Sequence, residues 1–310
     1  MEFSVIMPTL NEIKNIKKII ISLYHQTIQP KEVIIADGGS TDGTYEYLKD
    51  EEKNGLVKVI KSGNPSKARN DAIKNTHTNL ILCVDAWCEI ENTWCEKHVT
   101  LYKDSTISVA WWPSWIIFNT AFNKQAAPFW TPRNPQCFFF SSRNLSFRKE
   151  VREKVWGYPE YLTLSWEDTF FNYKIQHQGY TIEKCSAIVK RWGRQGFLWI
   201  YKMHRNYTQG DAEILMIHGI RQSATIRQAP LYLLWILCFI ISLYFFTRYA
   251  LVIVLLWCIS YGIRKNKTGL RFWIQYNFFQ KLGIIIGFLK GLYTWFLIKR
   301  KMKKEHLSYW

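Results

Sequence analysis

The residues of this 310-residue chain that are best suited to chemistry are carboxylates at the ends of short apolar runs. Asp37 and Asp85 each follow such a run directly, and the adjacent pair Glu167 and Asp168 opens a segment with helical spacing. Carboxylates can accept hydrogen bonds, ligate a divalent cation or take a proton from a hydroxyl group. These positions therefore indicate a site that binds a ligand and performs acid–base chemistry.

The elements that position these carboxylates are predicted to alternate between strand and helix. Strands are expected at 3–7, 33–36, 56–60 and 80–84, with helices from about 13, 44 and 66. Asn11 is expected to cap the first helix. Strands that alternate with helices predict an α/β fold with a mainly parallel sheet. Ligands bind at the carboxyl ends of such strands, which is where Pro8, Thr9, Asp37 and Asp85 lie.

The middle of the chain continues this pattern around an aromatic segment. Residues 142–148 and 181–190 are predicted strands, and 167–177 is a predicted helix that stops at Gly179. Residues 111–140 combine many Trp and Phe residues with four prolines, which suits a helix poorly. This segment is expected to be an irregular aromatic insertion beside the site or a plain packed loop.

The composition excludes several classes of protein. With 48% hydrophobic and 21% charged residues, the chain is not disordered. Its seven cysteines form no CxxC pair and no zinc-type spacing, so they are expected to be reduced and packed as small hydrophobic residues. No GxGxxG motif follows the first strand, which argues against a dinucleotide-binding dehydrogenase.

The net charge of +17 is concentrated at the C-terminal end. Residues 200–310 contain 16 of the 41 Lys and Arg residues but only 3 of the 24 Asp and Glu residues. Because the basic residues flank apolar segments, a membrane surface explains them better than a nucleic-acid backbone does. A membrane is therefore an expected partner, and nucleic acid is not.

Three apolar segments predict that residues 229–310 form membrane-associated helices with a basic tail. Residues 231–246 and 249–263 are uncharged runs, each shorter than the roughly 20 residues of a spanning helix, and predict a spanning or re-entrant hairpin. Basic residues after position 263 and the cluster 299–304 favour the cytosolic side. Segment 272–298 is then expected to lie in the interface or re-enter, with a third crossing as the alternative. The N-terminus lacks the features of a signal peptide, so the front domain is expected in the cytosol.

An ordered set of short motifs resembles the family-2 glycosyltransferases of the GT-A fold over residues 3–210. The set comprises SVIMPTLNE at 4–12, IIADGGSTDGT at 34–44, ARN at 68–70, VDA at 84–86 and WED at 166–168. Membrane-anchored members of this family are similar to the whole chain. The resemblance implies a GT-A-like catalytic domain over 1–228, which binds a nucleotide-diphosphate sugar and transfers its sugar with inversion.

The resemblance also implies roles for individual residues. Pro8, Thr9 and Glu12 match the segment that holds the nucleoside, and Asp37 matches the carboxylate that accepts from the base; an ordinary Asx turn is the alternative for Asp37. Arg69 matches a position near the donor phosphates, with a solvated helix arginine as the alternative. Asp168 matches the catalytic base, and Glu167 would orient it or contact the acceptor. For this acid pair, the alternative is two acids favoured by a helix N-terminus.

The chain departs from the family where the metal is usually held. The family pattern is Asp-x-Asp, and here the triplet is Asp85-Ala86-Trp87, so the second acid is replaced by an indole that cannot ligate Mg²⁺ or Mn²⁺. Three alternatives remain. Lys190 or Arg191 supplies the missing charge in a metal-independent mechanism, or Asp85 and Glu89 hold the metal with the diphosphate, or the enzyme is weakened or inactive.

The expected acceptor follows from the membrane prediction. Because the Gln-x-x-Arg-Trp signature of processive synthases is reduced to Arg191-Trp192, we expect transfer of a single sugar, with a UDP-sugar favoured as donor. The expected acceptor is a hydroxyl of a lipid-linked glycan or a polyprenyl phosphate. The alternative from another class is a non-catalytic membrane protein that keeps the nucleotide-binding fold.

Overall fold

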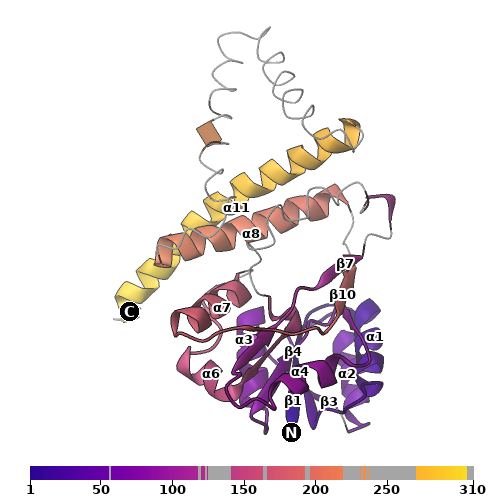
Figure 1. The fold of residues 1–310 in the computed structure, drawn as a ribbon. Coiled ribbons are helices and arrows are strands. Elements are labelled where there is room, and N and C mark those ends of the chain that lie inside the picture. Colours follow the sequence, from indigo (N-terminus) through magenta and orange to yellow (C-terminus); the bar gives the residue numbers. More distant parts are fainter. Residues whose placement is uncertain are drawn as a thin grey trace. The chain divides into compact units, whose positions relative to one another are not determined.

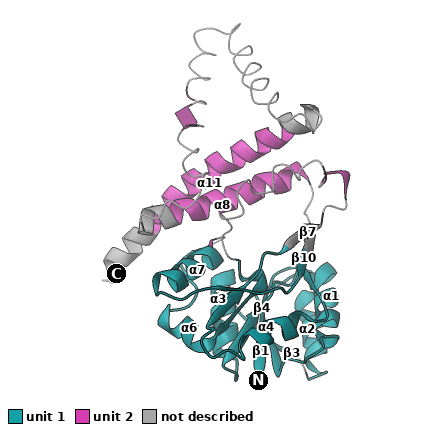
Figure 2. Ribbon diagram, in the orientation of Figure 1, with its two compact units in different colours: residues 1–118, 132–163, 167–193 teal, residues 119–131, 164–166, 194–310 magenta. Residues whose placement is uncertain are grey.

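The chain forms two compact units, each of which is described by itself. The computed structural model (Figure 1) describes residues 1–55, 57–117, 120–122, 124, 141–162, 166–192, 196–218, 231, 233, 234, 237 and 270–305. The first unit comprises residues 1–118, 132–163 and 167–193, and the second comprises 119–131, 164–166 and 194–310 (Figure 2). The predicted boundary at residue 228 lies outside the described residues and stays a prediction. Nearly all of the aromatic segment 111–140 after residue 117 also lies outside them, so its predicted irregular structure stays untested there.

The first unit is built on a seven-stranded sheet of order β3-β2-β1-β4-β8-β6-β9. Its strands are β1 (Phe3–Thr9), β2 (Glu32–Asp37), β3 (Val57–Lys61), β4 (Leu80–Cys83), β6 (Val109–Trp111), β8 (Leu145–Arg148) and β9 (Glu183–Lys184). Strands β3, β2, β1 and β4 are parallel, and β8 pairs antiparallel with both β4 and β6. The prediction of an α/β fold with a mainly parallel sheet is confirmed.

Helices cover both faces of this sheet (Figure 1). One core layer contains side chains of α1 (Ile13–Tyr24), α2 (Thr44–Glu52) and α4 (Trp94–Leu101). The other contains side chains of α3 (Pro65–Lys74), α6 (Lys149–Lys154) and α7 (Glu167–His177). Within β1, Val5 and Met7 belong to the first layer and Ile6 to the second, as expected for a pleated strand that is buried on both faces.

A second, smaller sheet corrects the prediction of one strand over 181–190. Its order is β5-β10-β7, from β5 (Cys88–Ile90), β10 (Val189–Trp192) and β7 (Trp115–Ile117). The predicted strand is two strands, since β9 pairs with β6 in the large sheet and β10 pairs with β5 and β7 in the small one. Segment 181–190 therefore passes from one sheet to the other.

The start of α1 differs from the prediction that Asn11 caps it. Asn11 has a left-handed backbone (φ 55°), and its Oδ1 accepts a 2.8 Å hydrogen bond from the Thr41 amide. Thr44 Oγ1 accepts from the Glu12 amide and Asp42 Oδ2 from the Ile13 amide. Because the loop after β2 and the first residue of α2 supply these acceptors, the start of α1 and the loop are held together at one end of the sheet.

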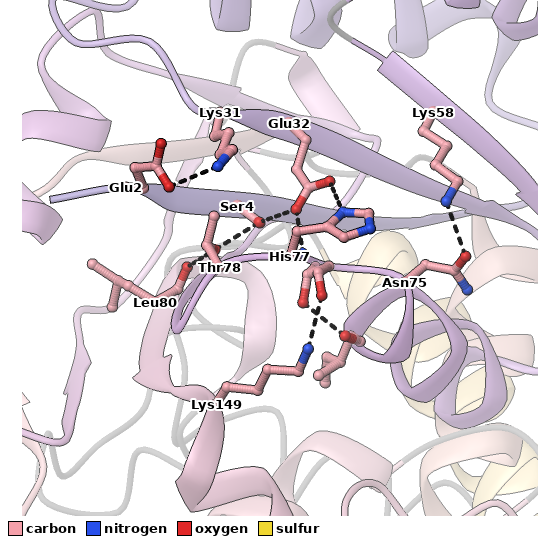
Figure 3. Close-up of polar contacts among 12 residues, drawn as sticks. Glu2, Ser4, Lys31, Glu32, Lys58, Asn75, His77, Thr78, Leu80 and Lys149 are labelled. Atoms are coloured by element: carbon pink, nitrogen blue, oxygen red, sulfur yellow. Dashed lines mark hydrogen bonds and ion pairs between the residues drawn. The ribbon is translucent and has the colours of Figure 1, made fainter.

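A polar cluster joins the opposite ends of the strands (Figure 3). Glu32 Oε1 accepts from Ser4 Oγ at 2.7 Å and from the His77 amide at 2.6 Å, and Ser4 Oγ also bonds Thr78 Oγ1. Burial works against ionisation of Glu32, but these hydrogen bonds outweigh it and hold its pKa below the ordinary value. The cluster fixes the amino-terminal ends of β1, β2 and β4, whereas the candidate site residues Thr9, Asp37 and Asp85 lie at the carboxyl ends.

The second unit contains two long helices that pack closely against each other, α8 (Phe197–His218) and α11 (Leu270–Glu305). Gly283, Gly287 and Gly291 of α11 lie where any Cβ would overlap the backbone of α8, at Tyr201, Arg205 and Gln209. Glycines at every fourth position form one side of a helix, so they permit this close approach.

The predicted membrane segments are only partly within the described residues. The hairpin predicted over 231–263 lies outside them, apart from positions 231, 233, 234 and 237. Segment 272–298 is part of the continuous helix α11. No helix in the described part of the chain is long and apolar enough to cross a membrane.

Candidate functional site

The carboxyl ends of β1 and β2 bring Pro8, Thr9 and Asp37 together. Thr9 and Asp37 are register partners, as are Pro8 and Ala36. Thr9 is 6% exposed, and its buried Oγ1 finds no hydrogen-bond partner among the described residues. The neighbouring Glu12 is also buried and accepts from Asn15 Nδ2 at 2.7 Å. A polar oxygen without a partner at a strand end is suited to a ligand.

Asp37 closes the turn that follows β2. Its Oδ2 accepts from the amides of Gly39 and Ser40 at 2.9 Å each, and its Oδ1 accepts from Ser40 Oγ. This is the geometry of the Asx turn. The role of Asp37 toward a nucleobase stays a prediction, and in this structure its carboxylate holds the loop over residues 37–40.

Arg69 joins two of the predicted site residues in a buried ion-pair cluster. Its Nη1 donates to Glu167 Oε1 at 2.7 Å and its Nη2 donates to Asp85 Oδ1 at 2.9 Å. Arg69 is 4% exposed, so the alternative of a solvated helix arginine is wrong. The cluster connects α3, the end of β4 and the first turn of α7, three elements that are distant in sequence.

The charges of this cluster depend on one another. Burial by itself would lower the pKa of Arg69, but the carboxylates of Asp85 and Glu167 raise it well above the ordinary value. Burial and the neighbouring charge of Asp168 raise the pKa of Glu167, and Arg69 opposes that rise. The guanidinium is therefore the charge that permits two carboxylates to be buried together.

Asp168 lies beside this cluster with a more accessible carboxylate. It is half-buried, and its Oδ1 accepts a 2.8 Å hydrogen bond from the Thr169 amide. The Glu167 carboxylate is bonded to Arg69, whereas the Asp168 carboxylate accepts from the adjacent Thr169. Of the two acids, Asp168 is the better placed to meet a substrate.

The turn at Gly157 and Tyr158, which the sequence analysis did not single out, packs against Arg69. The guanidinium lies 5.5 Å from the ring centroid of Tyr158, whose ring stacks on Phe171 at 4.0 Å. Asn70, next to Arg69 on α3, donates to the Tyr158 carbonyl and accepts from its amide. The signals in the sequence were Asn70 itself, which lies in the ARN motif, and the Gly157-Tyr158 pair.

After the end of β4, Asp85 and Trp87 both contact arginine side chains. Asp85 is bonded to Arg69, and the half-buried Trp87 has the guanidinium of Arg143 5.3 Å from its ring centroid. Within the described residues, no group of three His, Cys, Asp or Glu side chains could hold a metal ion. At Asp85 these residues thus supply one carboxylate, already shared with Arg69, which is fewer protein oxygen ligands than an Asp-x-Asp triplet offers to Mg²⁺ or Mn²⁺.

The two cations proposed as substitutes for the metal are on β10. In the small sheet, Lys190 pairs with Glu89 and Arg191 pairs with Cys88. Lys190 is exposed, and the side chain of Arg191 lies outside the described residues. Their roles stay predictions, whereas Arg143, which was not a candidate, has a defined position. It lies within the predicted strand 142–148, whose observed part, β8, begins only at Leu145, and this placement was the signal available in the sequence.

Asp37 and Asp85 thus lie at or just after the carboxyl ends of parallel strands, where ligands of such sheets bind, and Arg69 joins Asp85 to Glu167. Residues 4–156 match the family model for glycosyl transferase family 2. The chain thus contains a family-2 glycosyltransferase domain, and its enzyme class is glycosyltransferase.

Two curated proteins are similar to the chain. Glycosyltransferase AglE of Haloferax volcanii is 24% identical over 252 residues, which are 76% of this chain and 79% of AglE. The poly(ribitol-phosphate) beta-N-acetylglucosaminyltransferase TarS of Staphylococcus aureus is 38% identical over 93 residues. That match covers 28% of this chain and only 16% of TarS.

Solved structures show the same fold. The mannosyltransferase PcManGT from Pyrobaculum calidifontis, in complex with GDP-Man and Mn²⁺, superposes with a TM-score of 0.64 at 16% identity over 94% of this chain and 87% of that one. Residues 1–349 of TarS in complex with UDP-GlcNAc give a TM-score of 0.52 at 23% identity over 69% and 67%. At these identities the likeness shows the fold alone, which is α/β and GT-A-like with a mostly parallel sheet.

Proposed function

We propose that the protein is an inverting glycosyltransferase that moves one sugar from a nucleotide-diphosphate sugar, with a UDP-sugar as the favoured donor, to a hydroxyl of a membrane-linked acceptor. The observation that carries the proposal is the ion-pair cluster next to Asp168. Arg69 joins Asp85 to Glu167, and Glu167 directly precedes Asp168 in the chain. Asp168 is thus half-buried in the first turn of α7, and the charge of the adjacent Glu167 is paired with Arg69.

In the proposed reaction, the acceptor oxygen attacks the anomeric carbon of the donor sugar. The bond from that carbon to the distal phosphate oxygen breaks, and its electron pair leaves with the nucleoside diphosphate. The acceptor proton passes to the carboxylate of Asp168, which acts as the general base. Glu167 and Arg69 are positioning residues, because they fix the first turn of α7 on which Asp168 lies.

The structure supports the membrane part of the proposal through the outer side of α11. Of the six large apolar residues that are exposed in the described part of α11, five recur at intervals of 4, 7, 4 and 3 positions and lie opposite the glycines that face α8. They are Phe278, Leu282, Leu289, Tyr293 and Phe296. The basic residues of 299–304 follow directly in the sequence. An apolar stripe next to a cationic cluster is suited to an anionic lipid surface.

Transfer is tested with the full-length protein, radiolabelled UDP-sugars and lipid extracted from the host membrane. We expect label in the lipid extract with the wild type and with Asp50→Asn, an exposed carboxylate on α2. Asp168→Asn should lower the rate by about 10²- to 10⁴-fold, the usual contribution of a general base, with unchanged UDP binding. Equal rates for Asp168→Asn and the wild type would contradict the assignment of the base.

The membrane part is tested separately by flotation with vesicles. Wild-type protein should float with vesicles that contain phosphatidylglycerol and less with pure phosphatidylcholine. The double variant Phe278→Ser and Phe296→Ser should float less, whereas Trp156→Ser removes an aromatic side chain that is 80% exposed in the first unit and serves as the control. Flotation of the double variant at the wild-type level would count against the apolar stripe.

A further inference from the structure

We propose that Arg143, whose guanidinium lies over the ring of Trp87, is the cation that binds the diphosphate of the donor in place of a resident divalent metal ion. The inference rests on the proposed function, since it concerns the same donor site. It assigns a role to a residue that lies outside the motifs of the sequence.

The position of Arg143 follows from strand register. Strand β8 pairs antiparallel with β4, with Cys83 opposite Leu145 and Leu82 opposite Ser146. Arg143 precedes β8 by two residues and Asp85 follows β4 by two, so both lie beyond the same end of this strand pair. The contact between Arg143 and Trp87, 5.3 Å from guanidinium carbon to ring centroid, is at the carboxyl end of β4.

The neighbours of Arg143 tie it to the buried cluster. Ser142 Oγ forms a 2.8 Å hydrogen bond with Tyr158 Oη, and the Tyr158 ring lies against the Arg69 guanidinium. On the other side, Asn144 accepts from Trp94 Nε1 at 2.8 Å and donates to the Ala187 carbonyl at 2.8 Å. Fixed residues on both sides therefore hold the backbone of Arg143.

The chemistry of the pair suits a diphosphate better than a metal. Trp87 offers no oxygen ligand, and Asp85 is already bonded to Arg69, so Asp85 contributes at most a shared carboxylate. A guanidinium presents N–H groups in a planar fork that matches phosphate oxygens, and an indole face is the best aromatic platform for such a cation. A half-buried, preorganised cation can stabilise the charge that develops on a leaving diphosphate.

The experiment compares binding of uridine, UMP and UDP, with GDP as the second nucleotide, by calorimetry of the full-length protein in EDTA and in Mn²⁺. Wild-type protein should bind UDP or GDP in EDTA. Arg143→Ala should weaken diphosphate binding by about 10- to 100-fold, as for the loss of a hydrogen bond to a charged group, and leave nucleoside binding nearly unchanged. Arg143→Lys should recover part of the loss.

Two further variants separate this role from a structural one. Arg148 at the far end of the same strand β8 also has its guanidinium over an aromatic ring, 5.5 Å from that of Tyr102, so Arg148→Ala is the matched control and should leave UDP affinity unchanged. Trp87→Asp restores an acid two positions after Asp85 and should make UDP binding respond to Mn²⁺.

The outcomes distinguish this inference from the proposed function. Wild-type UDP and GDP binding that requires Mn²⁺, or unchanged affinity in Arg143→Ala, would overturn the cation role of Arg143 and leave the proposed function intact. Binding of neither nucleotide under any condition, by protein that circular dichroism shows to be folded, would overturn the proposed function itself.

Discussion

Arg69 Nη1 donates a 2.7 Å hydrogen bond to Glu167 Oε1, which joins two residues 98 positions apart in the sequence. Both side chains are almost completely buried, at 4% and 9% exposure. The bond fixes the first turn of α7 against α3, and through α7 it fixes the position of Asp168. The site is therefore assembled by an ion pair in the interior of the first unit.

Replacing Arg69 should cost more stability at high pH than at low pH. Arg69→Met leaves Asp85 and Glu167 buried without their cation, which costs about 3–5 kcal/mol when one partner of a buried pair is removed. Burial and Asp168 already raise the pKa of Glu167, so loss of Arg69 raises it further and proton uptake relieves the charge. Urea unfolding at pH 8 and pH 5.5 measures the cost, which should be smaller at pH 5.5.

The conservative variant Arg69→Lys serves as the control for this prediction. It keeps the charge but cannot donate in a fork to two carboxylates, so its cost should lie between zero and that of Arg69→Met. A cost for Arg69→Met that is independent of pH would mean that the two carboxylates are not left charged.

Much of the first unit could be predicted because its strands and helices have strong local patterns. Strands β1, β2 and β4 are short apolar runs that end in Thr9, Asp37 and just before Asp85, and parallel topology alone places these ends at one edge. The confirmed helices α3 and α7 carry Arg69 and Glu167. Proximity of the candidate residues could thus be predicted, because it follows from element order.

The contacts themselves could not be predicted, because they depend on partners that are distant in sequence. Asn11 is a good helix cap by type, yet the loop after β2 and the first residue of α2 supply the acceptors and Asn11 bonds Thr41 instead. Segment 181–190 has one apolar pattern but pairs with two sheets, and the exposed Glu183 and Lys184 contain no signal for which neighbour they join. The position of Arg143 over Trp87 likewise follows from the pairing of β8 with β4.

The stability of the first unit should fall between pH 7 and pH 5 because of His98. Burial lowers the pKa of this residue to about 4, although its hydrogen bond with Asn144 opposes the shift. A group whose pKa is lower in the folded state than in the unfolded state, here about 4 against 6.5, lowers stability as the unfolded chain takes up its proton. The loss between pH 7 and pH 5 should be about 2 kcal/mol.

The variant His98→Gln isolates this effect from other titrating groups. Glutamine keeps polar contact with Asn144 and Ser146 but does not titrate, so the variant should lose about 2 kcal/mol less than the wild type over the same range in urea unfolding. Parallel pH profiles for the two proteins would show that His98 does not account for the loss.

Glycine at position 157 should be far more sensitive to replacement than glycine at position 179. Both have positive φ, 65° and 82°, so alanine costs about 1–2 kcal/mol at each through the left-handed backbone. At Gly157 the new Cβ would also lie 2.5 Å from Asn70 Oδ1, whereas at Gly179 it meets nothing within 4 Å. Urea unfolding should show the larger loss for Gly157→Ala. Equal losses would mean that the turn yields without disturbing Asn70.

In the second unit, the packing of α8 against α11 should depend on the glycine side of α11. A Cβ at Gly287 would overlap the Arg205 carbonyl, so Gly287→Ala must separate the two helices or shift one along the other, at a cost of about 1–3 kcal/mol for overpacking. Hydrogen exchange of peptides that cover residues 201–212 should therefore become about tenfold or more faster, since 1.4 kcal/mol corresponds to a factor of ten. Leu289→Ala alters the opposite side of α11, where Leu289 is 49% exposed, and should leave this exchange unchanged. If both variants exchange as slowly as the wild type, the close approach at Gly287 contributes nothing to holding the helices together.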